Sequence, residues 1–256
     1  MREPHAIAER LIRSERDRVP ITPFSRADPF LPIETAYRAQ ACFYRERLDV
    51  GERLVGFKLG LTSRVKQLAL GIDQPVYGHL TSGMLLPFQA PARLDELINP
   101  RIEPELAFVI GRRVDPDARL PDIVDAIEGV LPALEIVDSR YDAPFRLIDS
   151  VADNAGAARV VLGPIRRAPA DLTDLSLVGC VFRHPAGIDT GAGGAVMGHP
   201  AVALHWLAVA LAGRGEALEP GQLVLSGGLT GSVPLTAKAT VRAEFDGLGA
   251  VAVHAE

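Results

Sequence analysis

The sequence predicts an α+β fold, with a helical N-terminal segment followed by a large, curved and mostly antiparallel sheet. Apolar residues recur at helical spacing near the N-terminus, whereas from residue 54 the chain consists of short apolar runs separated by Gly and Pro. Strand candidates dominate the C-terminal two thirds, and strands and helices do not alternate strictly, which argues against a doubly wound sheet. We expect residues 1–50 to form the helical segment and residues 51–256 the strand-rich domain, together as one structural unit.

Two helices are expected at the start of the chain, and the first is amphipathic. Ile7, Leu11 and Ile12 share one helical face, which predicts a helix over residues 4–18, and prolines then interrupt the pattern. A second helix is expected over residues 33–48, with a proline near its first turn and a glycine after its end.

Strands make up most of the remaining elements. The predicted strands are residues 54–59, 106–110, 134–137, 159–162, 176–182, 222–226, 239–245 and 249–254. Three further helices are expected between them, at residues 63–70, 120–126 and 200–212.

The composition is that of an ordinary globular protein. With 256 residues, of which 48% are hydrophobic and 23% charged, the chain can form one large domain with a sizeable core. The net charge of −5, and the lack of a basic stripe with interleaved aromatic residues, argue against a nucleic-acid partner.

The N-terminal residues and the cysteines bear on the compartment. Residues 1–20 are highly charged and lack the apolar stretch of a secretory signal, and the apolar run at residues 201–212 is too short to span a bilayer. Cys42 and Cys180 lie in apolar surroundings, which is typical of buried free thiols in a reducing compartment, with a disulfide as the alternative. We therefore expect a cytoplasmic protein with no membrane partner.

Three glutamates indicate a metal site. Glu103 and Glu105 are two residues apart at the start of an apolar strand, so their side chains face the same side, and Glu135 is embedded in another apolar run. Burying bare carboxylates together is costly, and a hard divalent cation such as Mg²⁺ or Mn²⁺ resolves the conflict. The alternative is that they are exposed strand residues or form ion pairs with arginines such as Arg101 and Arg140. The first interpretation predicts a metal-dependent enzyme.

Lys58 lies between Gly56 and Gly60 in an apolar run. A lysine in such a run is usually a surface residue whose ammonium reaches water. The flanking glycines indicate close backbone approach instead, and a lysine beside a metal-bound oxyanion would stabilise its charge. The glycine spacing does not fit a phosphate-binding loop.

Three further motifs have both a structural and a functional interpretation. Gly227 and Gly228 begin a glycine-rich loop that could turn backbone N–H groups toward an anion, although a flexible turn is the simpler interpretation. His199 precedes a predicted helix, and a helix-entry role is favoured over a proton carrier. Asp153 and Asn154 are typical of a turn, and Asn154 could also orient a ligand or a metal-bound water. No histidines have the spacing of a zinc site.

Ordered motifs from residue 54 to the C-terminus carry a family resemblance. They are Gly56-Phe57-Lys58-Leu59-Gly60-Leu61-Thr62-Ser63, Gln74-Pro75-Val76-Tyr77-Gly78, Arg101-Ile102-Glu103-Pro104-Glu105, Leu134-Glu135-Ile136-Val137-Asp138-Ser139-Arg140, Val151-Ala152-Asp153-Asn154-Ala155, Gly198-His199-Pro200 and Ser226-Gly227-Gly228-Leu229-Thr230. Together they resemble the 2-hydroxypentadienoate hydratase and 4-oxalocrotonate decarboxylase family, which is similar to the C-terminal domain of fumarylacetoacetate hydrolase.

The resemblance implies a mixed β-roll fold, with residues 51–256 as the catalytic domain. It implies that Glu103, Glu105 and Glu135 bind Mg²⁺ or Mn²⁺ and that Lys58 is a catalytic residue in the substrate pocket. The same motifs supply the residues expected to bind substrate, which are Leu59, Thr62, Val76, Tyr77, Ser139, Arg140, Asn154, Gly227, Gly228 and Thr230.

Val76 favours the decarboxylase branch. The hydratases usually have Asp at this position, in an Asp-Phe-Gly context, since adding water needs an acid or base that valine cannot provide. An aliphatic residue followed by Tyr-Gly resembles the decarboxylases, as do the pairs Arg140-Tyr141 and Gly227-Gly228. The resemblance therefore implies metal-dependent decarboxylation of 2-oxo-3-hexenedioate to 2-hydroxypenta-2,4-dienoate and CO₂, in the meta-cleavage degradation of aromatic compounds. Gly156 departs from the family pattern, which usually has Ser there, and this puts the substrate specificity in question.

Three alternatives stay open. The first is a hydratase acting on 2-hydroxypenta-2,4-dienoate. The second is hydrolysis of an acylpyruvate, which usually needs a His–Glu pair that the sequence does not locate. The third is a non-enzymatic partner of a companion hydratase. We expect a small 2-oxo dicarboxylic acid as substrate, a homo-oligomer, and a complex with a companion hydratase as one further interaction.

Overall fold

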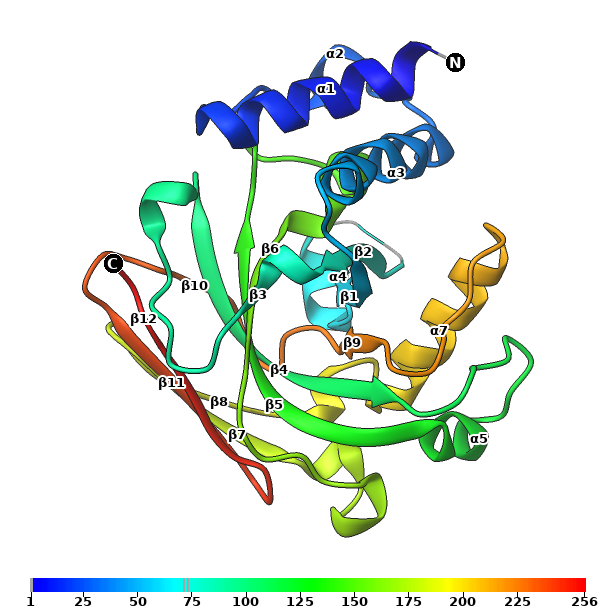
Figure 1. Cartoon of the computed structure of the whole chain (residues 1–256), viewed down its shortest axis with the longest axis vertical. Coiled ribbons are helices and arrows are strands. Elements are labelled where there is room, and N and C mark those ends of the chain that lie inside the picture. Colours follow the sequence, from blue (N-terminus) through cyan, green and yellow to red (C-terminus); the bar gives the residue numbers. More distant parts are fainter. Residues whose placement is uncertain (1, 71, 73) are drawn as a thin grey trace.

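The computed structural model describes residues 2–70, 72 and 74–256, and within them two sheets are joined to a layer of N-terminal helices (Figure 1). The helices are α1 (Arg2–Asp17), α2 (Phe24–Ala27), α3 (Ile33–Asp49), α4 (Arg64–Leu70), α5 (Leu120–Asp125), α6 (Leu147–Ala152) and α7 (Pro200–Ala212). Helices α1 and α3 lie together at one end of the larger sheet, while α7 packs against α5 at the other (Figure 1).

The larger sheet has eight strands within the described residues, in the order β2-β1-β9-β4-β5-β6-β3, with β10 paired to β4. They are β1 (Leu54–Gly60), β2 (Val76–Thr81), β3 (Leu85–Leu86), β4 (Pro100–Ile110), β5 (Ile127–Asp138), β6 (Ala157–Leu162), β9 (Leu223–Leu225) and β10 (Val233–Pro234). All pairs are antiparallel except β1–β9 and β3–β6. The predicted, mostly antiparallel sheet is therefore confirmed.

The smaller sheet packs against the larger one. Its strands, in the order β12-β11-β7-β8, are β12 (Gly249–His254), β11 (Thr240–Phe245), β7 (Gly179–His184) and β8 (Gly187–Ala192). Strands β11 and β12 contact β5, and β4 and β5 curve visibly around the centre of the molecule (Figure 1). Register shifts at Val109/Ile110 and at Ile136/Val137 are irregularities of the kind that bend strands.

The apolar faces expected from the sequence hold the N-terminal helices in place. Ile7 and Leu11 of α1, and Ala36 and Phe43 of α3, are buried in the same core as the larger sheet. Burying these faces removes apolar surface from water, which is the main stabilisation such a helix receives. Both predicted helices are confirmed with bounds close to those expected.

Two strands are longer than predicted. The expected strands at residues 106–110 and 134–137 are only the ends of β4 and β5, which pair from Pro100 opposite Asp138 to Ile110 opposite Ile127. Pro104 has no amide hydrogen and reads as a break, but its carbonyl accepts a hydrogen bond from the Leu229 amide at 2.9 Å. The pairing partner, and not local propensity, extends the strand through the proline.

One predicted strand starts too early. Residues 176–182 were expected to be extended, but Leu175–Leu177 forms a 3₁₀ turn and β7 begins only at Gly179. The carboxylate of Asp174 accepts a hydrogen bond from the Ser176 amide at 2.7 Å, which stabilises the turn.

Several short elements were not expected at all. They are α2, α6, β2, β3, β8 and β10. In β2, Gly78 interrupts the apolar pattern, yet all six residues of the strand are buried. A Cβ atom at Gly78 would lie 2.3 Å from the Asn154 carbonyl oxygen, so glycine is required by a close approach that sequence alone does not reveal.

The cysteines and the lengths of the helices can also be compared with the sequence. Cys42 and Cys180 are both free thiols, with Cys180 buried and Cys42 half-buried. Among the described residues, no helix combines the length and the apolar character that crossing a bilayer requires.

Candidate active site

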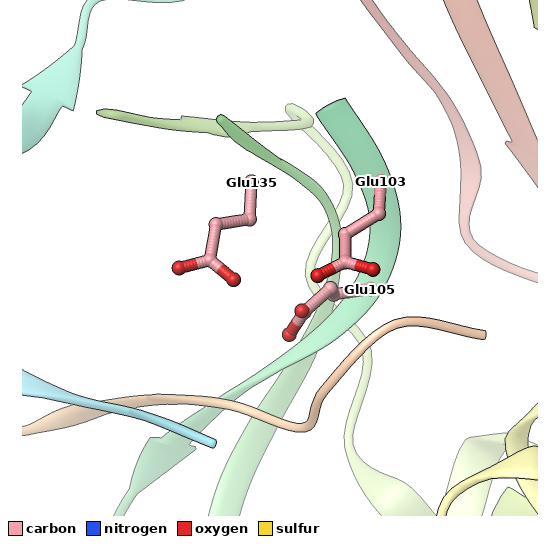
Figure 2. A group of neighbouring side chains, drawn as sticks. All are labelled: Glu103, Glu105 and Glu135. Carbon is pink, nitrogen blue, oxygen red and sulfur yellow. The ribbon is translucent and has the colours of Figure 1, made fainter. Parts of the chain in front are cut away.

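Three carboxylates converge where β4 and β5 pair. Glu103 of β4 lies directly opposite Glu135 of β5, and Glu105 follows two residues along β4 on the same face. One oxygen from each carboxylate lies within 4.8 Å of the others. Figure 2 shows the three side chains pointing into one space. The predicted convergence is therefore present in the structure.

The electrostatics of this cluster are unfavourable without a cation. Glu105 and Glu135 are fully buried. Burial, together with repulsion from the other two glutamates, raises the pKa of Glu105 well above its usual range. Burial also raises the pKa of Glu135, although the attraction of Lys58 opposes it.

Carboxylate oxygens of two of these glutamates also lack hydrogen bonds. Among the described residues, Oε1 of Glu105 and Oε1 of Glu135 are buried without a hydrogen-bond partner. Such orphaned oxygens are costly, and a divalent cation satisfies them and offsets the accumulated negative charge. An all-carboxylate donor set suits Mg²⁺ or Mn²⁺, so the residues present fit the metal that the sequence predicts.

Lys58 completes the cluster from β1. Its Nζ lies 3.0 Å from Oε2 of Glu135 and donates a hydrogen bond to the Ala155 carbonyl at 3.0 Å. Burial alone would lower the pKa of this lysine, but the surrounding glutamates outweigh it and the pKa is raised. Lys58 therefore keeps its ammonium charge inside the protein.

A cavity of about 310 Å³ opens beside the cluster. Four of the residues predicted to be catalytic, metal-binding or substrate-binding line it, namely Lys58, Val76, Glu103 and Ser139. They come from β1, β2, β4 and the end of β5, so the larger sheet brings together segments that are far apart in the chain. A volume of this order suits a small-molecule ligand.

The glycine-rich loop packs against the carboxylates. The Gly227 amide donates a hydrogen bond to Oε2 of Glu105 at 2.7 Å. A Cβ at Gly228 would lie 2.3 Å from Oε2 of Glu103, and one at Gly227 would lie 2.2 Å from Oγ1 of Thr62. The loop is therefore a close-fitting wall that positions the glutamates, not the flexible turn that was the simpler interpretation. Thr230 follows in the same loop, and its hydroxyl donates to the Gly231 carbonyl at 3.1 Å.

Leu59 and Tyr77 lie on the opposite face of the sheet from the cavity. Each is the strand neighbour of a cavity residue, so its side chain points the other way. Both are buried in the core, and Tyr77 stacks on Tyr37 with ring centroids 5.0 Å apart. Direct contact of Leu59 and Tyr77 with substrate stays a prediction, and their positions do not support it.

Arg140 and Asn154 also make structural contacts. The guanidinium of Arg140 is buried and lies 3.0 Å from a Glu15 carboxylate oxygen and 3.4 Å from an Asp153 oxygen. The Asn154 amide group donates to the His79 carbonyl at 2.9 Å and accepts from the His79 amide at 2.7 Å. These contacts hold the chain behind the cavity, and a direct role in substrate binding stays a prediction for both residues.

His199 has the helix-entry role that the sequence favours. Nδ1 of His199 accepts a hydrogen bond from the Ala201 amide at 3.1 Å, which caps the start of α7. His79 is buried against aromatic rings, stacking on Tyr44 with centroids 3.8 Å apart. Neither residue lines the cavity.

The cavity wall also contains residues that sequence reasoning did not assign to it. They are Gly60, Leu61, Asn99, Arg101, Val137, Phe145, Ser150, Asp153, Ala155 and Ser232. Gly156, at which the sequence departs from the family pattern, lines the cavity as well. Arg101 carried a usable signal, because it is two residues before Glu103 and so lies on the same strand face. Asp153 carried a weaker signal, because its motif was interpreted only as a turn. Burial raises the pKa of Asp153 to about 7, although Arg140 partly offsets this effect.

Comparisons with known proteins agree with this architecture. The family model described as fumarylacetoacetate (FAA) hydrolase C-terminal matches residues 73–255. A solved structure of 4-oxalocrotonate decarboxylase from Pseudomonas putida G7, complexed with magnesium and adipate, is similar to this chain with a TM-score of 0.95 and 32% identity, over 100% of this chain and 98% of that chain. The predicted fold class is therefore confirmed.

Curated relatives carry two kinds of name. A 2-keto-4-pentenoate hydratase of Paraburkholderia xenovorans (strain LB400) is 36% identical over 252 residues, which cover 97% of this chain and 93% of the relative. A 4-oxalocrotonate decarboxylase of Pseudomonas putida is 34% identical over 252 residues, which cover 97% of this chain and 95% of the relative. These identities are too close to separate the two activities. The chain thus belongs to the fumarylacetoacetate hydrolase family, within its branch of hydratases and decarboxylases.

Proposed function

We propose that this protein is a metal-dependent carboxy-lyase that converts 2-oxo-3-hexenedioate to 2-hydroxypenta-2,4-dienoate and CO₂ in the meta-cleavage degradation of aromatic compounds. The observation that carries the choice between the two branches is Val76, which lines the same cavity as Lys58 and Glu103. Adding water across a double bond requires an acid or base, and an aliphatic side chain provides neither. The resemblance to the hydratases would put Asp at this position.

The metal would be held by Glu103, Glu105 and Glu135, whose oxygens converge. Among the described residues, Oε1 of Glu105 and Oε1 of Glu135 have no hydrogen-bond partner. When bound, Mg²⁺ or Mn²⁺ would supply Lewis acidity that polarises the 2-oxo group of the substrate. The Gly227 amide and the packing of Gly228 keep Glu105 and Glu103 in place.

Lys58 is placed to stabilise the charge that develops in the reaction. Decarboxylation breaks the bond between C5 and C6, and its electron pair forms the C4–C5 double bond. The existing double bond shifts to C2–C3, and negative charge collects on the 2-oxygen, which a proton then converts to the enol. A buried ammonium interacts strongly with such a charge because the surroundings are poorly polarisable.

Val76 forms an apolar wall that suits the neutral product CO₂. It is buried, and a Cβ built on Gly60 would lie 3.0 Å from its Cγ2 atom, so the two residues lie close together. An apolar wall favours loss of charge from a carboxylate placed against it.

A hydratase is the second candidate, and one observation favours it. Asp153 lines the cavity, and its pKa of about 7 lies near neutrality, where a carboxyl group can exchange protons. Its two oxygens are engaged with Arg140, since one accepts from the Arg140 amide at 3.1 Å and the other lies 3.4 Å from the guanidinium. We therefore rank this candidate second.

The test is an ultraviolet assay of the purified protein with 2-oxo-3-hexenedioate, with and without Mg²⁺ or Mn²⁺, while CO₂ release is followed in parallel. Metal-dependent CO₂ release with formation of 2-hydroxypenta-2,4-dienoate is expected. Consumption of separately supplied 2-hydroxypenta-2,4-dienoate without CO₂ release from the hexenedioate would identify a hydratase and overturn the weight placed on Val76.

A further inference from the structure

The turn between α6 and β6 has an unusual backbone. Asn154, Ala155 and Gly156 are all left-handed, with φ angles of 53°, 52° and 69°. Glycine and asparagine adopt this conformation readily, but alanine rarely does, because its Cβ comes too close to the following carbonyl oxygen. Strain of this kind persists only where surrounding contacts over-determine it, and it concentrates at functional sites. The contacts that hold this turn therefore bear on function.

The side chain of Asn154 holds the turn against β2, which is the first strand in the order of the larger sheet. It is fully buried, and its amide group accepts from the His79 N–H at 2.7 Å and donates to the His79 carbonyl at 2.9 Å. A neighbouring strand would pair with His79 through the same two backbone groups. Gly78 permits the approach, because a Cβ there would lie 2.3 Å from the Asn154 carbonyl oxygen. The turn is thus fastened to β2 as an extra strand would be.

The fastened turn contacts Lys58 of β1. The Ala155 carbonyl accepts a hydrogen bond from Nζ of Lys58 at 3.0 Å, and Oε2 of Glu135 lies 3.0 Å from the same nitrogen. One contact does not fix an ammonium on a flexible four-carbon stem, so the carbonyl and the carboxylate fix it together. A cation bound by the glutamates would compete for the charge of Glu135, whereas the Ala155 carbonyl lies outside the carboxylate cluster. The hydrogen bond to the turn therefore sets where the charge of Lys58 lies.

We infer that Asn154 is a positioning residue for Lys58. Its side chain fastens the strained turn to β2, and the turn carries the Ala155 carbonyl that holds the ammonium at the active-site cavity. Lys58 and Ala155 both line that cavity, whereas Asn154 is not part of its described wall, so Asn154 acts through Lys58 and not on the substrate. This inference rests on the proposed function, because it assumes that Lys58 stabilises the charge that develops on the 2-oxygen.

Double-mutant kinetics test whether Asn154 acts through Lys58. Asn154→Gly removes both hydrogen bonds to His79 and keeps a residue that tolerates the left-handed backbone. It should lower kcat about 10-fold or more with little change in KM, because a displaced charge stabilises the transition state less well. In a Lys58→Met background, the same substitution should change kcat by less than about 3-fold, since the group through which it acts is already gone. Equal fold-losses in the two backgrounds would overturn the inference, as would a raised KM with an unchanged kcat.

Gln40→Ala is the matched control. Gln40 is buried, and its amide nitrogen also binds β2, donating to the Tyr77 carbonyl at 2.9 Å and to the Val151 carbonyl at 2.8 Å. The variant loses two buried hydrogen bonds, as Asn154→Gly does, so it should lower Tm and yet leave kcat within a few-fold of the wild type. A loss of kcat as large as that of Asn154→Gly would show that any loosening of β2 has this effect, and would overturn the specific role. Gly78→Ala displaces the same turn from the side of the strand and should reproduce the kinetic pattern of Asn154→Gly.

A labelling experiment reports on Lys58 without any turnover. The chain has three lysines, of which Lys238 is exposed, whereas Lys58 is 2% exposed. With an amine-acetylating reagent and mass spectrometry of the peptides, Lys58 should react much more slowly than Lys238 in the wild type. Asn154→Gly should speed the labelling of Lys58 about 10-fold, because a released turn opens more often, and Gln40→Ala should leave it unchanged. A wild type in which Lys58 reacts as fast as Lys238 would overturn the inference.

The labelling experiment is independent of the reaction that the protein catalyses. If no CO₂ is released but Lys58 is protected in the wild type and loses its protection in Asn154→Gly alone, the proposed decarboxylation fails and the positioning of Lys58 by Asn154 stands. If CO₂ is released and Asn154→Gly has the turnover and the labelling of the wild type, the decarboxylase stands and the role of Asn154 is wrong.

Discussion

Glu103 lies directly opposite Glu135 in the antiparallel ladder between β4 and β5. Like charges in facing positions destabilise a sheet, and here both strands are largely buried, so water offers little screening. A third carboxylate, Glu105, lies two residues away on the same face. A cation bound by this cluster would therefore stabilise the pairing of β4 with β5.

Metal binding should stabilise the fold through this cluster. Mg²⁺ at 100 times its Kd should add about 2.7 kcal/mol to the free energy of unfolding, which calorimetry with and without EDTA would detect as a rise in Tm. Glu105→Gln replaces a carboxyl group that burial and the neighbouring glutamates make costly to ionise. The metal-free variant should therefore unfold a few degrees above the metal-free wild type, on the order of 1 kcal/mol, and gain nothing from Mg²⁺.

Glu128→Gln is the control for that experiment, since Glu128 lies on β5 with its side chain 59% exposed and pairs with Arg166. It should retain the full Mg²⁺ effect. An undiminished rise in Tm with Mg²⁺ in Glu105→Gln would remove Glu105 from the ligand set.

The loop glycine Gly228 should be as important for metal affinity as a ligand. A Cβ at this position would lie 2.3 Å from Oε2 of Glu103, so Gly228→Ala should displace that carboxylate and weaken Mg²⁺ binding about 10-fold or more. Gly231→Ala is matched in chemistry, and its added Cβ has no neighbour within 4 Å. Titration with Mg²⁺ or Mn²⁺ should show a loss of affinity in the first variant alone, and equal affinities in the two would contradict this role of Gly228.

Lys58→Met should reduce kcat much more than it changes KM. The variant removes the buried ammonium that lies 3.0 Å from Glu135, and losing one such electrostatic group typically costs about 10²- to 10³-fold in rate. Circular dichroism and a Mg²⁺-dependent rise in Tm would show that the fold and the metal site persist. A kcat within a few-fold of the wild type would remove Lys58 from the catalytic residues.

Val76 separates the two candidate activities. Val76→Asp places a buried carboxylate against the group that leaves as CO₂, and Val76→Asn adds polarity of similar shape without charge. The rate of decarboxylation should fall about 10-fold or more in Val76→Asp and less in Val76→Asn, because only the aspartate repels the leaving carboxylate of the substrate. Stopped-flow measurement of CO₂ release would compare them, and equal losses would show that charge is not the cause.

Asp153 should make stability depend on pH. Its pKa is raised to about 7 in the folded protein, above the value of about 4 expected in the unfolded chain. Between these values the folded state keeps a proton that the unfolded state has released. The free energy of unfolding should therefore fall as the pH rises from about 4 to about 7, by a few kcal/mol at most, and stop changing above that range.

Urea unfolding of the wild type and Asp153→Asn at several pH values would check this. The variant should lose part of the pH dependence, while Asp246→Asn, at an exposed aspartate, should keep all of it. An unchanged slope in Asp153→Asn would show that the carboxyl group is already ionised across the range.

The sequence predicted those parts of the site that depend on local spacing. Glu103 and Glu105 share a face because strand side chains alternate, and the apolar run around Glu135 indicated burial. Helix α7 and strand β12 were predicted with the bounds that the structure has, because each is a clear periodic or apolar run between Gly and Pro residues.

The parts that sequence reasoning missed depend on long-range contacts. In the sequence, Gly78 indicates a break in a strand, and only the structure shows that Asn154 approaches it too closely for a side chain. The pairing of Arg140 with Glu15 cannot be foreseen, because the two residues lie 125 positions apart in the chain. Arg101 was considered only as an ion-pair partner for the glutamates, although its spacing from Glu103 already indicated the strand face that lines the cavity.

The ion pair between Arg140 and Glu15 limits how this protein can be engineered. A chimaera that kept the two sheets and exchanged the first helix for an unrelated one would leave a buried guanidinium facing Asp153 with one carboxylate fewer. Removing one partner of a buried ion pair typically costs about 3–5 kcal/mol, a large share of the stability of an ordinary domain. Helix α1 should therefore be transplanted together with the sheets.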